Sequence, residues 1–214
     1  MPTVHGAAAS PFVRKVRVFL AEKGVPYELD PVVPFPPANA TPEFRRMSPL
    51  GKVPAFSDGD FAISDSSVIC AYLERVHPTP ALYPSDPAQY ARALWLEEFA
   101  DGRLVETIAP AFFQRVVRRK FFQQEPDEAA VRQALEGLPQ WLDYLEGQLG
   151  DAAYFVGGRF SIADIAIATI LQQLRHAGEA IDAARWPRLA AWADRVLARP
   201  SFKGCLDEER ALLG

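Results

Sequence analysis

Hydrophobic positions near the start of the chain follow first a strand pattern and then a helix pattern. Thr3-Val4-His5 is a short β-prone run, and the apolar residues at positions 12, 13, 16, 19 and 20 have the spacing of one helix face. Ser10-Pro11 in front of them is typical of a helix start, because serine caps the first turn and proline is tolerated there. The pattern predicts a strand, a helix that ends at Gly24, and a second strand within residues 27–33.

A second pair of strands is predicted on either side of the turn Asp58-Gly59-Asp60. A tight Asp-Gly turn joins antiparallel strands, whereas the helix between the first two strands implies parallel pairing. The helical pattern of residues 67–73 follows directly. We therefore expect residues 1–78 to form a mixed four-stranded sheet covered by helices, which is the thioredoxin-like α/β plan.

The composition changes at residues 78–87, where four prolines occur in ten residues. Such a stretch is typical of a stiff linker at a domain boundary. We expect a linker at 79–87 and an all-helical domain over 88–214. Within that domain, Ser161 and Asp164 have the spacing of a capping box in front of an apolar run, which predicts a buried helix.

The overall charge and the cysteines narrow the function classes. Lys and Arg number 23 against 27 Asp and Glu, a net charge of −4, which argues against a nucleic-acid partner. The two cysteines form no Cys-x-x-Cys or Cys/His cluster, and we find no secretory signal and no apolar run long enough to span a membrane. We expect a cytoplasmic protein with no metal and no membrane partner.

The stretch Gly51-Lys52-Val53-Pro54, followed by Asp65-Ser66 at a helix start, is the strongest candidate for a ligand site. A Val-Pro bond can be cis, which turns the polar backbone groups of Val53 outward to pair with a peptide ligand. A helix N-terminus with a hydroxyl suits a carboxylate, and Asp65 beside it suits an ammonium group. The alternative is an ordinary hairpin followed by an N-capped helix.

This run resembles the glutathione-binding site of the cytosolic glutathione S-transferases, in particular their serine-type, theta/zeta-like bacterial or related classes. The family more often has Glu where Asp65 stands. The resemblance implies that Val53 pairs with the cysteinyl backbone of glutathione, and that Ser66 with the helix start holds the γ-glutamyl carboxylate. The stretch Gly157 to Asp164 resembles the capping box of the family's helical domain, so the resemblance spans both expected domains.

Ser10 matches the catalytic hydroxyl of the serine-type classes, which stabilises the glutathione thiolate. The alternatives are that Ser10 is only a helix cap, or that Ala9 or a nearby backbone N–H shares the role. Cysteine is absent at position 10, which argues against a glutaredoxin-like thiol mechanism. The Ser-Ser-Cys pattern of the zeta-class isomerases is absent too.

The resemblance also suggests less specific assignments. Lys52 would pair with the glycyl carboxylate of glutathione, and Asn39 stands where some relatives have a histidine contacting the same group. The family's electrophile pocket, between its two domains, would be lined by four apolar residues: Phe12, Phe112, Phe113 and Val116. Aromatic residues at such spacing are also common in a protein core.

These observations favour a glutathione transferase that uses glutathione as co-substrate against a small apolar electrophile and, as is usual in the family, forms a homodimer and serves detoxification. One alternative is a glutathione-dependent isomerase or dehalogenase on the same fold. Another is a non-catalytic, transferase-like binding module. The joint presence of Lys52, Pro54, Asp65 and Ser66 argues against the last of these.

Overall fold

The computed structural model describes residues 1–33, 35 and 37–213, and these divide into two compact units. Unit 1 holds Met1–Leu82 together with Pro200–Leu212, and unit 2 holds Tyr83–Arg199. The sequence led us to expect residues 88–214 in one helical domain. The grouping of the described residues differs at the last helix, which belongs with unit 1.

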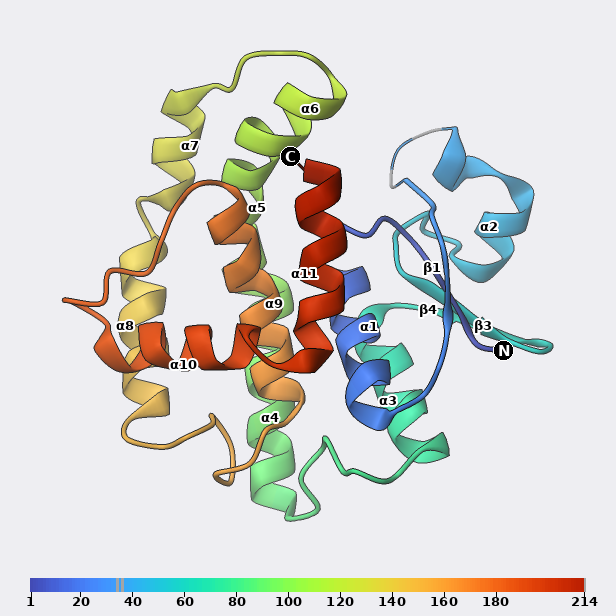
Figure 1. Cartoon of the computed structure of the whole chain (residues 1–214), viewed down its shortest axis with the longest axis horizontal. Helices are drawn as coiled ribbons and strands as arrows, with labels where there is room; N and C mark the ends of the chain where they lie inside the picture. Colours follow the sequence, from blue (N-terminus) through green and yellow to red (C-terminus); the bar gives the residue numbers. More distant parts are fainter. Residues whose placement is uncertain (34, 36, 214) are drawn as a thin grey trace. The chain divides into compact units, whose positions relative to one another are not determined.

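Unit 1 is built on a four-stranded sheet in the order β2-β1-β3-β4 (Figure 1). β1 pairs in parallel with β2, and the pairs β1–β3 and β3–β4 are antiparallel. The mixed sheet of the thioredoxin-like plan is therefore confirmed. The strands are β1 (Thr3–His5), β2 (Glu28–Asp30), β3 (Ala55–Asp58) and β4 (Phe61–Ser64).

Helices complete unit 1, and their apolar faces are buried with the sheet. Val4 of β1 lies opposite Phe56 of β3, and both are fully buried together with Val16 and Phe19 of the first helix. Gly24, with φ 66°, ends that helix in the left-handed conformation that glycine adopts without strain. The helices are α1 (Pro11–Lys23), the 3₁₀ turn η1 (Ala38–Ala40), α2 (Pro42–Met47), α3 (Ser66–Val76) and α11 (Pro200–Leu213).

The described part of unit 2 contains helices and no extended strand. Its first half is a nearly continuous helical run in which two segments, η2 and η3, are π-helical, with one additional residue per hydrogen-bonded turn. The elements are α4 (Pro87–Phe99), η2 (Ala100–Leu104), α5 (Val105–Phe112), η3 (Phe113–Arg118), α6 (Arg119–Phe121), α7 (Glu128–Leu135), α8 (Leu138–Leu149), α9 (Ile162–His176) and α10 (Pro187–Leu197).

The core of unit 2 is arranged around α9, which is buried over most of its length as its apolar sequence predicts. Asp164 in its first turn is also fully buried. Its Oδ2 accepts hydrogen bonds from the backbone N–H and the hydroxyl of Ser161, at 3.0 and 3.1 Å. Its Oδ1 accepts from the backbone N–H of Phe155 and the indole of Trp192, at 3.2 and 3.0 Å. Both oxygens of this buried carboxylate therefore have hydrogen-bond partners, and Asp164 joins the start of α9 to Phe155 and α10.

Candidate functional site

Ser10 caps α1 and keeps its hydroxyl at the positive end of that helix. Its backbone is extended, with φ −72° and ψ 129°, and Oγ accepts a 3.5 Å hydrogen bond from the N–H of Val13. The cap uses an oxygen lone pair, so the hydroxyl proton remains able to donate to an anion. The residue is half-buried. Ser10 thus combines a donor with the N–H groups and dipole of a helix start.

The segment that leads to β3 lies within the same unit and is held by side chains. The Val53–Pro54 bond is cis, as the sequence allows, and Val53 lies before the paired part of β3. The hydroxyl of Ser48 donates to the carbonyl oxygen of Lys52 at 2.7 Å. The carboxamide of Asn39 donates to the carbonyl oxygen of Gly51 at 3.0 Å.

Gly6, which the sequence analysis did not single out, brings this segment close to α1. A Cβ atom at Gly6 would lie 2.4 Å from Cγ2 of Val13 and 3.2 Å from Cβ of Val53. Only glycine therefore allows the loop after β1, the first turn of α1 and the Val53 segment to approach this closely. The sequence signal is a glycine directly after the predicted strand Thr3-Val4-His5 and four positions before Ser10, where a close approach of two backbones is common.

The start of α3 has the cap that the sequence predicts, made by a residue with unusual backbone geometry. Asp65 has φ 85°, and its Oδ1 accepts from the N–H groups of Ser67 and Val68 at 3.0 and 3.1 Å. The carboxylate is exposed, whereas Ser66 beside it is buried. Asp65 is thus both a helix cap and an exposed negative charge next to the α3 start.

Lys15 is a further charged residue at this place that sequence reasoning missed. Its ammonium group donates to Oγ of Ser67 at 2.8 Å, and its side chain is fully buried. The link connects α1 to the first turn of α3, so the two helix starts are fixed to each other. The sequence gives no clear signal for this burial, because position 15 carries a charge and is not one of the apolar positions 12, 13, 16, 19 and 20.

The two remaining glutathione candidates differ in their freedom to bind a ligand. Lys52 is exposed, and its ammonium group forms no ion pair with a side chain that the structure describes. Asn39 is buried, and within the described part of the chain its Oδ1 has no hydrogen-bond partner. An unpaired carbonyl oxygen accepts an N–H and repels a carboxylate. Asn39 is therefore better suited to an amide of the ligand than to the glycyl carboxylate.

The four candidate electrophile residues belong to different units. Phe12 lies in the first turn of α1 in unit 1 and is half-buried. Phe112, Phe113 and Val116 follow one another at the α5–η3 junction of unit 2. The Phe113 ring is 40% exposed and lies 6.4 Å from the ring of Phe122. Each of the two units therefore contains a candidate aromatic residue with accessible surface.

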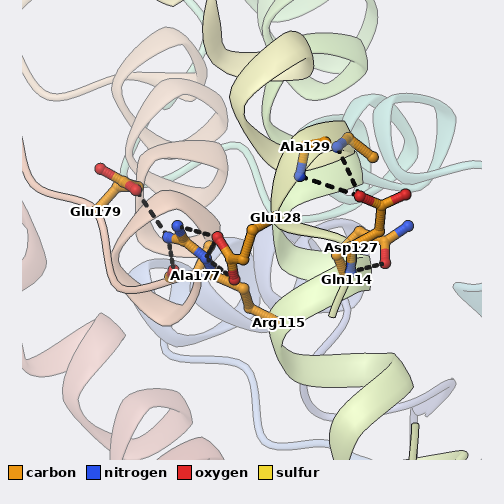
Figure 2. Close-up of polar contacts among 8 residues, drawn as sticks. Gln114, Arg115, Asp127, Glu128, Ala129, Ala177 and Glu179 are labelled. Carbon is orange, nitrogen blue, oxygen red and sulfur yellow. Dashed lines mark hydrogen bonds and ion pairs between the residues drawn. The ribbon is translucent and has the colours of Figure 1, made fainter. Parts of the chain in front are cut away.

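Arg115 connects η3 to two other segments of unit 2 (Figure 2). Its Nη2 donates to Oε2 of Glu128 in α7 at 2.8 Å. Its Nη1 donates to Oε1 of Glu179 at 2.7 Å and to the carbonyl oxygen of Ala177 at 2.9 Å. The hydrogen bonds to Glu128 and Glu179 raise the pKa of Arg115, and Arg115 holds the pKa of Glu128 below its usual range.

A neighbouring contact attaches the same segment to the beginning of α7. Gln114 Oε1 accepts from the N–H of Asp127 at 3.0 Å, and Asp127 in turn caps α7 through the N–H of Ala129 (Figure 2). The π-helical turn that carries Phe113 and Val116 is therefore held from both sides. Such turns are frequent at functional sites.

His5 links three strands through its two ring nitrogens. Nδ1 lies 2.8 Å from Oδ2 of Asp30, and Nε2 lies 2.8 Å from Oγ of Ser57. The order Asp-His-Ser is that of a hydrolase triad. However, β3 lies between β1 and β4, so the amides around Ser57 pair within the sheet and supply no oxyanion hole. We interpret the series as a stabilising link between β1, β2 and β3.

The described residues offer neither a cluster of metal-binding side chains nor a helix that could span a membrane. Over residues 1–33, 35 and 37–213, no three His, Cys, Asp or Glu side chains gather as a metal ion would require. Over the same residues, no helix has both the length and the apolar character needed to cross a bilayer.

Two family models and a curated relative all indicate the same protein family. Residues 9–76 match the family model "Glutathione S-transferase, N-terminal domain", and residues 104–200 match "Glutathione S-transferase, C-terminal domain". The chain is 31% identical over 204 residues to glutathione S-transferase 3 of Zea mays, covering 94% of this chain and 90% of the relative.

Solved structures that are similar to this chain belong to the same family. A glutathione S-transferase from Rhodospirillum rubrum F11 aligns with TM-score 0.85 and 29% identity, covering 96% of this chain and 92% of that chain. A glutathione S-transferase-I bound with the ligand lactoylglutathione aligns with TM-score 0.86 and 25% identity, covering 95% of this chain and 97% of that one.

Proposed function

The chain belongs to the glutathione S-transferase family, and we propose that Ser10 activates the thiol of glutathione for attack on a small apolar electrophile. The observation that carries the proposal is the geometry of Ser10, a hydroxyl with a free proton at the N-terminus of α1. We further propose that the protein is of the serine-type, theta/zeta-like kind.

The proposed role is consistent with the energies involved. A free thiol has a pKa of about 8.5, and lowering it by two units requires about 2.7 kcal/mol of preference for the anion. A hydrogen bond to a charged acceptor contributes about 1.5–3 kcal/mol. The N-terminus of a helix adds about 0.3–1 kcal/mol. Together the Ser10 hydroxyl and the α1 start contribute about 1.8–4 kcal/mol, a range that includes the preference required for a thiolate at pH 7.

The remaining candidates would hold the glutathione backbone. The backbone of Val53, fixed in orientation beside Pro54, would pair with the cysteinyl residue. Ser66 and the α3 start would take the γ-glutamyl carboxylate, and the exposed Asp65 its ammonium group. A similar structure carries lactoylglutathione, which supports a glutathione-type ligand for this chain.

Two further assignments complete the ligand contacts. Lys52 would pair with the glycyl carboxylate, because its ammonium group is exposed close to the same segment. Asn39 would accept a ligand amide N–H at its unpaired oxygen. For the electrophile, we propose Phe12 from unit 1 and Phe112, Phe113 and Val116 from unit 2. Family resemblance also leads us to propose a cytoplasmic homodimer that uses no metal.

The test compares wild type, Ser10→Ala and Ser10→Thr with glutathione at pH 7. Calorimetry measures binding, and the ultraviolet thiolate band measures ionisation of the bound thiol. We expect binding in all three proteins, a thiolate band that is lost in Ser10→Ala, and its retention in Ser10→Thr, which keeps a hydroxyl and a cap. Binding with an unchanged band in Ser10→Ala would remove Ser10 from the chemistry. Absence of binding at millimolar glutathione would overturn the proposed site as a whole.

A further inference from the structure

A fully buried ion pair connects the first helix of the chain to the last. Arg14 Nε donates to Oε1 of Glu209 and Nη2 donates to Oε2, both at 2.6 Å, and neither side chain is accessible. Two parallel charge-assisted hydrogen bonds fix the distance and the relative orientation of the two groups. α11 is therefore held against α1 in one orientation, and Figure 1 shows the two helices side by side within unit 1.

Arg14 is close to the proposed catalytic hydroxyl along the helix. Its backbone N–H donates to the carbonyl oxygen of Ser10 at 3.0 Å, which forms the first hydrogen-bonded turn of α1. Residues four apart lie on the same side of a helix, one above the other. A displacement of Arg14 would therefore displace the turn that presents the Ser10 hydroxyl.

A second pair between the same helices offers a comparison. Arg17 Nη2 donates to Oε2 of Glu208 at 2.7 Å, and its Nε donates to the hydroxyl of Tyr27 at 2.8 Å. The Glu208 side chain is 53% exposed, in contrast to that of Glu209. Arg17 also lies about two turns from Ser10. This pair links α1 to α11 with less burial and at a greater distance from the site.

We propose that Glu209, acting through Arg14, is a positioning residue for Ser10. Removing two charges from water has a large desolvation cost, and apolar residues of similar volume in place of a buried pair are often equally or more stable. Stability alone therefore does not require this pair. What it adds over apolar contacts is a fixed orientation, and catalysis is sensitive to displacements of about 1 Å. The inference rests on the proposed role of Ser10.

The experiment replaces the pair by apolar residues rather than breaking it. In the double variant Arg14→Met/Glu209→Leu, α1 and α11 should remain packed against each other. The two parallel hydrogen bonds between the guanidinium and the carboxylate are lost. We expect unchanged or higher thermal stability, glutathione KM within about twofold of wild type, and kcat with a reactive aromatic chloride lower by about 10- to 100-fold. The thiolate band of bound glutathione at pH 7 should fall in parallel. The control Arg17→Met/Glu208→Leu should keep kcat and the band within about twofold.

Several other results would contradict the proposed role of Glu209. A folded Arg14→Met/Glu209→Leu variant with wild-type kcat and thiolate band would overturn it and leave the pair a structural contact. If that variant does not fold, Arg14→Lys replaces it, since lysine keeps the charge but not the two parallel bonds. Wild-type kcat in folded Arg14→Lys would equally overturn the inference. An effect of the same size in the control variant would also contradict it.

Failure of this proposal and failure of the proposed role of Ser10 give different experimental results. If Ser10→Ala retains the thiolate band, the proposed role of the serine fails and the backbone N–H groups of α1 become the stabilising groups. Loss of the band in Arg14→Met/Glu209→Leu would then show that the pair positions the helix start and not the hydroxyl, which contradicts the inference as stated.

Discussion

The indole Nε1 of Trp192 donates a 3.0 Å hydrogen bond to Oδ1 of Asp164, and both side chains are fully buried in unit 2. The tryptophan lies in α10 and the aspartate in the first turn of α9, so the bond joins two helices at a capped terminus. Burial raises the pKa of Asp164 to about 6, although its four hydrogen bonds favour the carboxylate.

This pKa predicts a pH dependence of stability between about pH 4 and pH 6. The folded-state pKa exceeds the ordinary value of 3.8, so the contribution of Asp164 is fully present below pH 3.8 and is lost as the pH rises through 6. Asparagine does not titrate. The free energy of unfolding of wild type relative to Asp164→Asn should therefore fall by about 3 kcal/mol between pH 4 and pH 7.5. Urea unfolding at the two pH values measures it, and a pH-independent difference would contradict it.

Asp65 should show separate effects of its cap and its charge. Asparagine at this position keeps an oxygen acceptor for the α3 amides and tolerates the positive φ, but it has no charge. We expect Asp65→Asn to keep the melting temperature within about 2 °C. Glutathione binding should weaken about tenfold, which corresponds to the loss of one hydrogen-bonded ion pair. Asp65→Ala should lose binding and also about 1 kcal/mol of stability. Equal binding by wild type and Asp65→Asn in calorimetry would remove Asp65 from the ligand site.

Gly6 predicts a steric effect on the same site. A methyl group there would overlap Val13 and press on Val53, so Gly6→Ala should destabilise the protein by about 1–3 kcal/mol and weaken glutathione binding. Gly147 in α8 is the matched control, because a Cβ atom there meets no described atom within 4 Å. Gly147→Ala should instead stabilise by about 0.5–1 kcal/mol and leave binding unchanged. Thermal unfolding and calorimetry on both variants test this prediction. Wild-type stability and glutathione binding in Gly6→Ala would contradict it and show that the loop can move aside.

Arg115 predicts an acid-sensitive contribution to stability. Because Arg115 lowers the pKa of Glu128, the contribution of the pair is present above the ordinary glutamate pKa and is lost as the pH falls through the lowered value. Arg115→Gln should lower the melting temperature at pH 7, and the difference from wild type should shrink toward pH 3. Arg210→Gln removes an exposed pair with Asp207 and should change the melting temperature little at either pH. A difference that stays constant with pH would assign the effect of Arg115 to packing.

The local features of the fold could be predicted from the sequence, because they depend on neighbouring residues. The Asp58-Gly59 turn gives the antiparallel pair β3–β4, and the spacing of Ser161 and Asp164 gives the start of α9. Ser10 and Asp65 are helix caps, as expected from their sequence positions. Each of these depends on residues at most a few positions apart.

Long-range pairing of charged residues could not be predicted in this way. Arg14 and Lys15 are charged residues on a helix whose apolar positions already define a buried face, and charged residues are ordinarily exposed. They are buried because Glu209 and Ser67, from distant parts of the chain, provide partners for them. Periodicity contains no information about a partner 195 residues away, so neither the Arg14 pair nor the return of α11 to unit 1 could be inferred.

The return of α11 has a consequence for synthesis on the ribosome. Arg14 precedes Glu209 by 195 residues, so α1 leaves the ribosome well before its partner residue in α11 has been made. Until Glu209 has been made, the carboxylate that pairs with Arg14 is missing, and removing one partner of a buried ion pair is strongly unfavourable. A nascent chain, or a fragment cut at the proline-rich linker, would therefore leave this part of α1 hydrated and open. α1 therefore reaches its final packing in unit 1 only after α11 has been synthesised.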